Sequence, residues 1–201
     1  DLCNKGTVKV LMKARATRQW DKLVQPMAWL KGNGRINEFL LVTGHLDAWE
    51  PGVTCNATGD ATILELARVL AKHRNMLKRD ICFVFWNGHE IAEAAGSTWF
   101  ADNYWDMLRD KCIVYKNIDS TGMKGASYYK VDASRELAQF AKIVAKEVLN
   151  EKVTVNYLAK TGDQSFFEIG IPSIAGRISF SDDYVESTHG ATLGWWNHTI
   201  E

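Results

Sequence analysis

The stretch EFLLVTGHLDAWEPGVTCNATG, Glu38–Gly59, decides the fold. Its apolar run at residues 39–42 is typical of a buried β-strand, and a Thr-Gly pair then leads directly to His45 and Asp47. Residues two apart on a strand point to the same side, so this imidazole and this carboxylate face one site. A loop rich in Gly and Pro follows, and a helix is expected from about Thr58. We therefore predict a site at the carboxyl end of this strand, where open α/β sheets bind their ligands.

Composition indicates one folded domain over residues 1–201. The apolar fraction is 46% and there are eight Trp, enough for a substantial core. Lys and Arg number 24, as do Asp and Glu, so no basic surface for nucleic acid is indicated. No apolar run approaches the roughly 20 residues of a membrane-spanning helix, and no signal peptide is visible. The four Cys lack the spacing of a zinc knuckle or a redox pair and leave the compartment undetermined. Because the chain opens on Asp1 and stops just after a motif at His198, we interpret it as a fragment of a longer protein.

Strands alternate with helices along the chain. This order predicts an α/β fold with a mixed, mostly parallel central sheet and helices on both faces, in three α/β/α layers. The expected strands cover residues 7–13, 27–30, 39–42, 81–86, 112–118 and 153–158, and a last one follows residues 171–174. The expected helices cover residues 59–73, 93–109 and 135–149, with a short one from 162 to 169. The strands at 27–30 and 39–42 are expected to pair as a hairpin, because Lys31–Gly34 is a strong turn signal.

Polar, chemically active side chains follow four of the expected strands. They are His45 with Asp47, His89 with Glu90, Asp119, and a late loop with His189 and His198. Each has an ordinary alternative, such as a hydrogen-bonded structural His or an Asx turn. Parallel strands, however, deliver all of them to one edge of the sheet. Imidazoles and carboxylates that converge in this way predict a hydrolytic zinc site in which the metal activates water.

A second reading of His89 uses helical spacing. His89 and Glu93 are four residues apart and would share a helical face, as in helix-borne zinc motifs. This segment lacks the second His of such motifs and directly follows an apolar strand, so the strand-end reading is preferred.

The chain resembles a known family over roughly Val10 to its end. GHLDAWEPG with the NATG turn, FVFWNGHE, NIDSTG, GDQSFFEIGIPS and the terminal HT resemble, in order, motifs of the co-catalytic zinc exopeptidases. That family includes secreted aminopeptidases, plasma glutamate carboxypeptidase and glutamate carboxypeptidase II, and the transferrin receptor ectodomain shares its fold. The resemblance implies the zinc-exopeptidase fold and one or two zinc ions. Members are often secreted or extracytoplasmic.

The resemblance also implies roles for individual residues. His45 matches a metal-ligand His, and Asp47 matches the carboxylate that orients it. Asp119 matches a terminal carboxylate ligand and His198 the last ligand His. Arg177 lies in a segment where the carboxypeptidases place substrate-binding arginines, although a solvated surface Arg is an equally good reading.

Two positions depart from the family pattern. Cys55 stands where the family has an Asp that bridges two zinc ions; a thiolate can bind and bridge zinc, or the thiol can be unliganded. The Glu-Glu pair, base then ligand, is replaced by His89-Glu90 when the alignment is anchored on the strand. Anchored instead on Gly96-Ser97, Glu90 is the base and Ile91 holds the ligand position. A neutral His can act as a base near pH 7.

These observations predict a zinc-dependent exopeptidase, either aminopeptidase or carboxypeptidase, acting on peptides or acylated amino acids. Asp47, His89 and Glu90 are the expected catalytic group, and the expected metal ligands are His45, Cys55, Glu90, Asp119 and His198. A mononuclear site that leaves Asp119 unused remains open, as does a homodimer. The competing hypothesis is a catalytically impaired homologue that serves as a binding or structural module. Aromatic residues are expected either to shape the substrate pocket or to belong to the core: Trp49, Phe166, Trp195 and Trp196.

Overall fold

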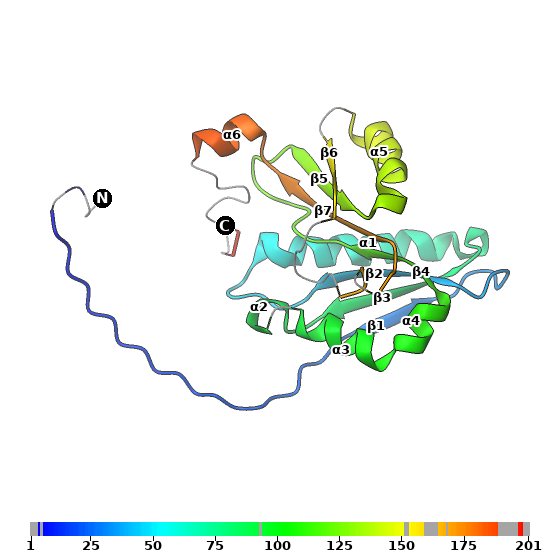
Figure 1. Ribbon diagram of the computed structural model, residues 1–201, viewed down its shortest axis with the longest axis horizontal. Helices are drawn as coiled ribbons and strands as arrows, with labels where there is room; N and C mark the ends of the chain where they lie inside the picture. Colours follow the sequence, from blue (N-terminus) through cyan, green and yellow to red (C-terminus); the bar gives the residue numbers. More distant parts are fainter. Residues whose placement is uncertain are drawn as a thin grey trace.

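A seven-stranded sheet forms the centre of the molecule (Figure 1). The computed structural model describes residue 4 and ranges 6–92, 94–150, 153–158, 165–167, 169–188 and 197–198. The strands lie in the order β1-β3-β2-β4-β7-β5-β6. Their bounds are β1 Met27–Leu30, β2 Phe39–His45, β3 Asp80–Trp86, β4 Cys112–Asn117, β5 Tyr128–Ala133, β6 Val153–Tyr157 and β7 Ser173–Ser179.

The sheet is mixed and mostly parallel, as the sequence predicts. Strands β3, β2, β4 and β7 are mutually parallel neighbours, and β5 is parallel to β6. Strand β1 runs antiparallel to β3, and β5 runs antiparallel to β7. The carboxyl ends of β2, β3 and β4 therefore meet at one edge, and this edge carries the candidate site.

Helices cover both faces of the sheet. They are α1 Thr58–Lys72, α2 His89–Ala92, α3 Ala95–Asn103, α4 Trp105–Lys111, α5 Arg135–Leu149 and α6 Asp182–Ser187. Figure 1 shows α1 and α5 on one face and α3 with α4 on the other, which confirms the three-layer arrangement. No helix in the described ranges is long and apolar enough to cross a membrane.

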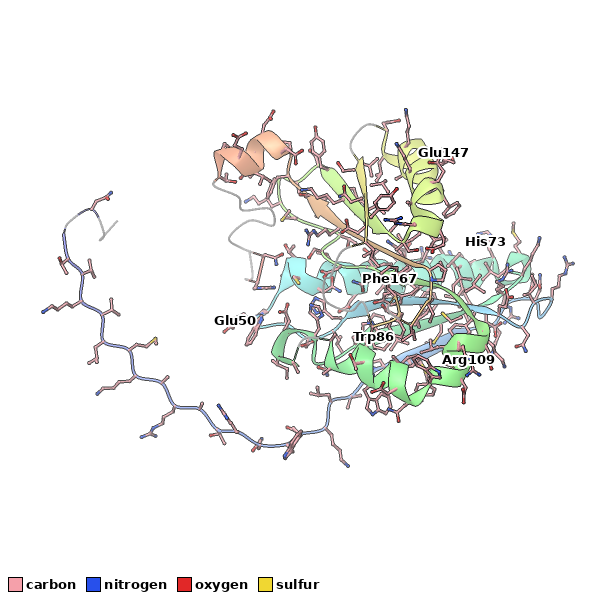
Figure 2. The ribbon with its side chains drawn as sticks, viewed as in Figure 1. Glu50, His73, Trp86, Arg109, Glu147 and Phe167 are labelled. Atoms are coloured by element: carbon pink, nitrogen blue, oxygen red, sulfur yellow. The ribbon has the colours of Figure 1, made fainter. Side chains whose placement is uncertain are left out.

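The strand alternation sorts side chains into separate cores. Leu41 and Trp86 pack with Phe100 of α3, whereas Val42 packs on the other face with Ile63 of α1. Trp86 is fully buried and lies in the interior in Figure 2. A third cluster joins α5 to strands β5 and β7. Fully burying one such apolar side chain contributes about 1.5–3 kcal/mol, so these cores hold the sheet edge in place.

Some predicted elements are wrong. Strand β1 pairs with β3, with Met27 opposite Val84, so the expected hairpin with β2 does not form. β2 lies between β3 and β4, which leaves the outer edge of β3 for β1. Residues 7–13 form no strand and are exposed along an extended segment (Figure 1).

The long helix expected over residues 93–109 is divided. Helices α3 and α4 are separated at Tyr104, whose φ of −118° and ψ of 23° are not helical. Glu93, and with it the helical His89–Glu93 pairing, lies outside the described residues. Strand β5 and helix α6 lie outside the ranges that the sequence predicts for strands and helices.

Candidate metal centre

His45 ends strand β2 and is completely buried. Its Nδ1 lies 2.8 Å from the backbone oxygen of Asp47, and because a carbonyl oxygen only accepts, Nδ1 carries the proton. Nε2 is then a lone-pair donor directed toward Cys55, with Sγ at 3.2 Å. A backbone carbonyl thus sets the tautomer that a metal ligand needs.

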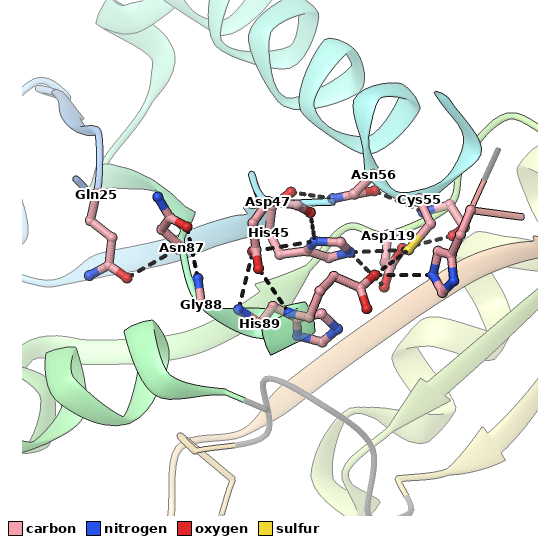
Figure 3. Close-up of polar contacts among 12 residues, drawn as sticks. Gln25, His45, Asp47, Cys55, Asn56, Asn87, Gly88, His89 and Asp119 are labelled. Carbon is pink, nitrogen blue, oxygen red and sulfur yellow. Dashed lines mark hydrogen bonds and ion pairs between the residues drawn. The ribbon is translucent and has the colours of Figure 1, made fainter. Parts of the chain in front are cut away.

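The carboxylate of Asp47 lies 3.8 Å from His45 Nδ1. It accepts the backbone N–H of His89 at 3.1 Å and of Glu90 at 2.9 Å (Figure 3). Asp47 therefore ties the end of β2 to the first turn of α2, where an acidic side chain also suits the helix dipole. The shorter contact to His45 comes from the Asp47 main chain rather than its side chain.

Cys55 lies at the centre of the site, with 5% of its surface exposed. Besides the contact to His45, its Sγ lies 3.5 Å from Glu90 Oε1 and 3.7 Å from Asp119 Oδ1, and its single S–H can donate to one of these carboxylates at a time (Figure 3). Burial, followed by the negative charges of Asp119 and Glu90, raises the pKa of the Cys55 thiol well above its usual range. Without a cation the group is a neutral thiol between two carboxylates.

The remaining predicted ligands complete two pairs around this sulfur. Asp119 Oδ2 lies 3.9 Å from His45 Nε2, and Glu90 Oε1 lies 3.1 Å from His198 Nε2. The structure thus brings all five predicted ligand residues together. Ile91, the ligand position in the alternative alignment, is 62% exposed, so the geometry favours the alignment with Glu90 in the ligand position.

His89 stacks on His45, with ring centroids 4.2 Å apart and planes 19° from parallel. It lines the same cavity as Glu90 and Asp119. Its ring nitrogen also falls within 4.8 Å of ligand atoms of His45 and Asp119. His89 therefore lies beside the ligand cluster, in reach of a molecule bound in the cavity.

The cavity over the site measures about 240 Å³ and is open to solvent. Arg177 and Asp132, from the paired strands β7 and β5, line it together with His89 and His198. A larger cavity of about 640 Å³ lies between residues 20–27 and α3, and Asp21 is its one charged lining residue among those described. The smaller cavity holds the chemically active groups.

Two of the four aromatic residues expected either at the pocket or in the core, Trp49 and Phe166, do not line this cavity. Phe166 is completely buried in the core against Trp86, and Trp49 is 58% exposed. Both are absent from the described lining of the 240 Å³ cavity. Trp195, Trp196 and His189 lie outside the described residues.

Two supporting residues escaped sequence reasoning. Asn56, only 2% exposed, donates from Nδ2 to the backbone oxygens of His45 and Ile118 and accepts the backbone N–H of Ser120 through Oδ1. Ser120 in turn donates to Asp119 Oδ1 at 2.8 Å. The signal was present in the NATG and DSTG turns, whose polar residues suggested turn formation rather than cross-links between strand ends.

The donor set fits a zinc-type cation. Imidazole, thiolate and carboxylate groups are the ligands that Zn²⁺ takes in proteins, and sets of three potential donor atoms here lie within 4.8 Å of one another. In the described ranges, Glu90 lies in ion-pair contact with His198, and Asp119 lies in ion-pair contact with His45. These carboxylates thus converge beside imidazoles that become metal ligands when neutral.

Comparison with known proteins identifies the family. The model of Peptidase family M28 matches residues 27–198. The chain belongs to peptidase family M28. Among curated proteins of this kind, transferrin receptor protein 1 of Gallus gallus is 30% identical over 133 residues, covering 64% of this chain and 17% of that protein. Probable glutamate carboxypeptidase VP8 of Zea mays is 23% identical over 191 residues, covering 94% and 26%. This M28 chain thus spans about a quarter or less of these relatives.

Solved structures show the same fold. BSAP, a zinc aminopeptidase from Bacillus subtilis, has a TM-score of 0.74 at 21% identity and covers 88% of this chain and 43% of its own. An aminopeptidase from Aneurinibacillus sp. strain AM-1 has a TM-score of 0.70 at 20% identity, with 87% and 41% covered. The zinc-exopeptidase-like fold expected from the sequence is therefore confirmed.

Proposed function

We propose that this chain is the metal-binding region of a zinc-dependent exopeptidase that hydrolyses peptides or acylated amino acids. The observation that carries the proposal is the convergence of four donor residues around the sulfur of Cys55 at the carboxyl edge of the sheet: three contact the sulfur, and His198 contacts one of these three, Glu90. His45 and Asp119 would hold one ion, Glu90 and His198 a second, with Cys55 between them. Bound zinc supplies a Lewis acid for the scissile carbonyl and lowers the pKa of a water to about 7.

The protein's own groups account for the remaining steps. His89 lines the cavity and is the group we assign to accept a proton from the attacking water and return it to the leaving amine. Asp47 accepts hydrogen bonds from the backbone N–H groups of His89 and Glu90 and so positions the backbone that carries both side chains. A relative that is named a probable glutamate carboxypeptidase and solved structures that are named aminopeptidases support an exopeptidase.

The cavity offers binding groups for either end of a peptide. Arg177 can pair with a substrate carboxylate, and Asp132 can pair with a free amino group. Arg177→Met would raise KM for acyl-glutamate substrates if the chain acts as a carboxypeptidase, and Asp132→Asn would raise KM for aminoacyl substrates if it acts as an aminopeptidase.

A second candidate is a binding or structural module without catalysis. Its support is specific: Cys55 and His89 both replace carboxylates of the family pattern, and the Gallus gallus relative is named a transferrin receptor. A neutral Cys55 thiol can donate its one proton to Glu90 or to Asp119, which gives the site an internal hydrogen bond without a metal.

Metal analysis of the purified protein, followed by hydrolysis assays, separates the two candidates. We expect one or two zinc ions per chain and turnover of aminoacyl or acyl-glutamate substrates that chelator abolishes and zinc restores. His198→Ala should lower the zinc content, whereas His73→Ala, an exposed histidine at the end of α1, should leave it unchanged. Absence of both bound zinc and chelator-sensitive turnover would favour the module.

A further inference from the structure

The sulfur of Cys55 is close to one donor atom of each ligand pair. It lies 3.2 Å from His45 Nε2 and 3.7 Å from Asp119 Oδ1, and 3.5 Å from Glu90 Oε1. Glu90 is itself 3.1 Å from His198. We propose that Cys55 supplies one sulfur shared by two cations, and that this sulfur makes the site select thiophilic cations, Zn²⁺, Co²⁺ and Cd²⁺, over Mg²⁺, Ca²⁺ and Mn²⁺. The inference rests on the proposed function, since it concerns the same metal site.

Proximity alone supports sharing. A sulfur that served one ion only would lie against a single ligand pair, whereas Cys55 contacts His45 and Asp119 from one pair and Glu90 from the other. Two triads of donor atoms, each with its atoms within 4.8 Å of one another, share His45: His45–Cys55–Glu90 joins members of both ligand pairs to the sulfur, and His45–His89–Asp119 lies beside it. Cys55 is the residue whose single ligand atom is in direct contact with members of both pairs.

The backbone fixes this sulfur where it is. Cys55 is buried, and the side chain of the next residue, Asn56, is hydrogen-bonded to His45 (Figure 3) and also to Ile118 and Ser120. The backbone of Val53–Ala57 therefore cannot move away from the strand ends without breaking bonds to β2 and to the segment that follows β4. A cation that binds at either ligand pair is therefore expected to lie within reach of the Cys55 sulfur.

Ligand softness then decides which cations bind. Thiolates favour Zn²⁺ and other soft or borderline cations, while carboxylate and carbonyl oxygens suit Mg²⁺, Ca²⁺ and Mn²⁺. A central carboxylate would leave such a site tolerant of hard cations. With sulfur at the shared position, a hard cation would face a poor ligand at either half of the site.

Cadmium-113 NMR on the full chain tests both parts of the inference. We expect two ¹¹³Cd signals from the wild type, and we expect Cys55→Asp to move both of them, because both ions lose the same sulfur. Competition titrations should show that Cys55→Asp lowers the ratio of Zn²⁺ to Mn²⁺ affinity by about tenfold or more, since even groups that only support a ligand change metal affinity about 10–100-fold. Cys112→Ala, which removes a buried thiol on β4, should change neither result.

Each outcome has a definite meaning. A shift of only one signal on Cys55→Asp overturns sharing, and no shift overturns the sulfur ligand, although zinc-dependent hydrolysis could still stand. A single bound ion per chain also overturns sharing. If neither Cd²⁺ nor Zn²⁺ binds the wild type, the proposed function fails together with the inference. Should Cys55→Asp not fold, the Co²⁺-loaded wild type still decides the sulfur ligand: a cobalt–thiolate charge-transfer band supports it, and its absence overturns it.

Discussion

Asn56→Ala should destabilise the metal-free protein strongly, because Asn56 links the two strand ends that carry the site. The side chain is 2% exposed and makes three hydrogen bonds, of 3.1, 3.2 and 3.0 Å, to His45 O, Ile118 O and Ser120 N. Each partner is a main-chain group, either at the end of β2 or in the segment directly after β4. Removal of the amide leaves those groups without this partner in the protein interior.

The magnitude follows from that count. A buried hydrogen bond contributes about 1 kcal/mol net, and a buried group left unsatisfied costs about 1–3 kcal/mol. Three bonds lost at once predict a decrease of about 3–5 kcal/mol in the free energy of unfolding. Since small domains are stable by only about 5–15 kcal/mol, this is a large fraction of the total.

Urea unfolding followed by tryptophan fluorescence, in the presence of chelator, measures the effect. Asn103→Ala is the matched control: its exposed amide donates once, to Trp99 within α3, and we expect a loss below about 1 kcal/mol. Asn56→Asp keeps an acceptor for Ser120 N–H but turns a buried carboxylate oxygen toward the carbonyl oxygens of His45 and Ile118, so it should cost at least as much as Asn56→Ala. A cost for Asn56→Ala no greater than that of Asn103→Ala would refute the cross-link.

Three other substitutions test neighbouring features. Gly59→Ala should destabilise by about 1–3 kcal/mol, because its Cβ would lie 2.1 Å from Asn56 Oδ1, although Ala in an unobstructed helix gains about 1 kcal/mol. Burial and nearby carboxylates raise the pKa of Asp60 to about 7. The free energy of unfolding of the metal-free wild type should therefore fall as the pH rises from about 4 to 7. Over that range, the free energy of unfolding of Asp60→Asn relative to the wild type should grow by about 1–4 kcal/mol. Burial lowers the pKa of Lys116 to about 8. At pH 7 Lys116→Met should therefore be more stable than the wild type by about 1–3 kcal/mol. This difference should shrink between about pH 8 and 10.5, where the folded wild type holds Lys116 neutral.

Urea or thermal unfolding across pH checks all three. Contrary results would be a stabilised Gly59→Ala, an Asp60→Asn difference that is flat with pH, or a Lys116→Met difference that grows above pH 8. Zinc should flatten the Asp60 dependence, because nearby positive charge favours the ionised carboxylate.

The order of strands and helices was readable in advance. A mostly parallel sheet is predicted by the apolar runs at β2, β3 and β4, because such runs indicate strands buried on both faces. The carboxyl ends of these strands lead to His45, His89, Glu90 and Asp119. These features depend on local periodicity and on the order of motifs, and both can be read directly from the sequence.

The pairing of strands at the edges of the sheet could not be predicted from the sequence in this way. Residues 7–13 and 128–133 both alternate, yet only the second stretch becomes a strand, because β7 and β6 offer it partners. The same holds for β1, which pairs with β3 and not with its sequence neighbour β2. An alternating segment needs a free sheet edge, and the availability of that edge is a property of the whole fold.

By itself, the sequence determined which chemical groups this protein brings to the rim of its sheet: imidazoles, carboxylates and one unusual thiol. Only the tertiary structure decided that Cys55 lies between His45, Glu90 and Asp119, and that Asn56 holds the strand ends together. The reason is physical. Distances between atoms that are 10 to 64 residues apart in the chain depend on strand register and loop path, which local residue patterns do not specify.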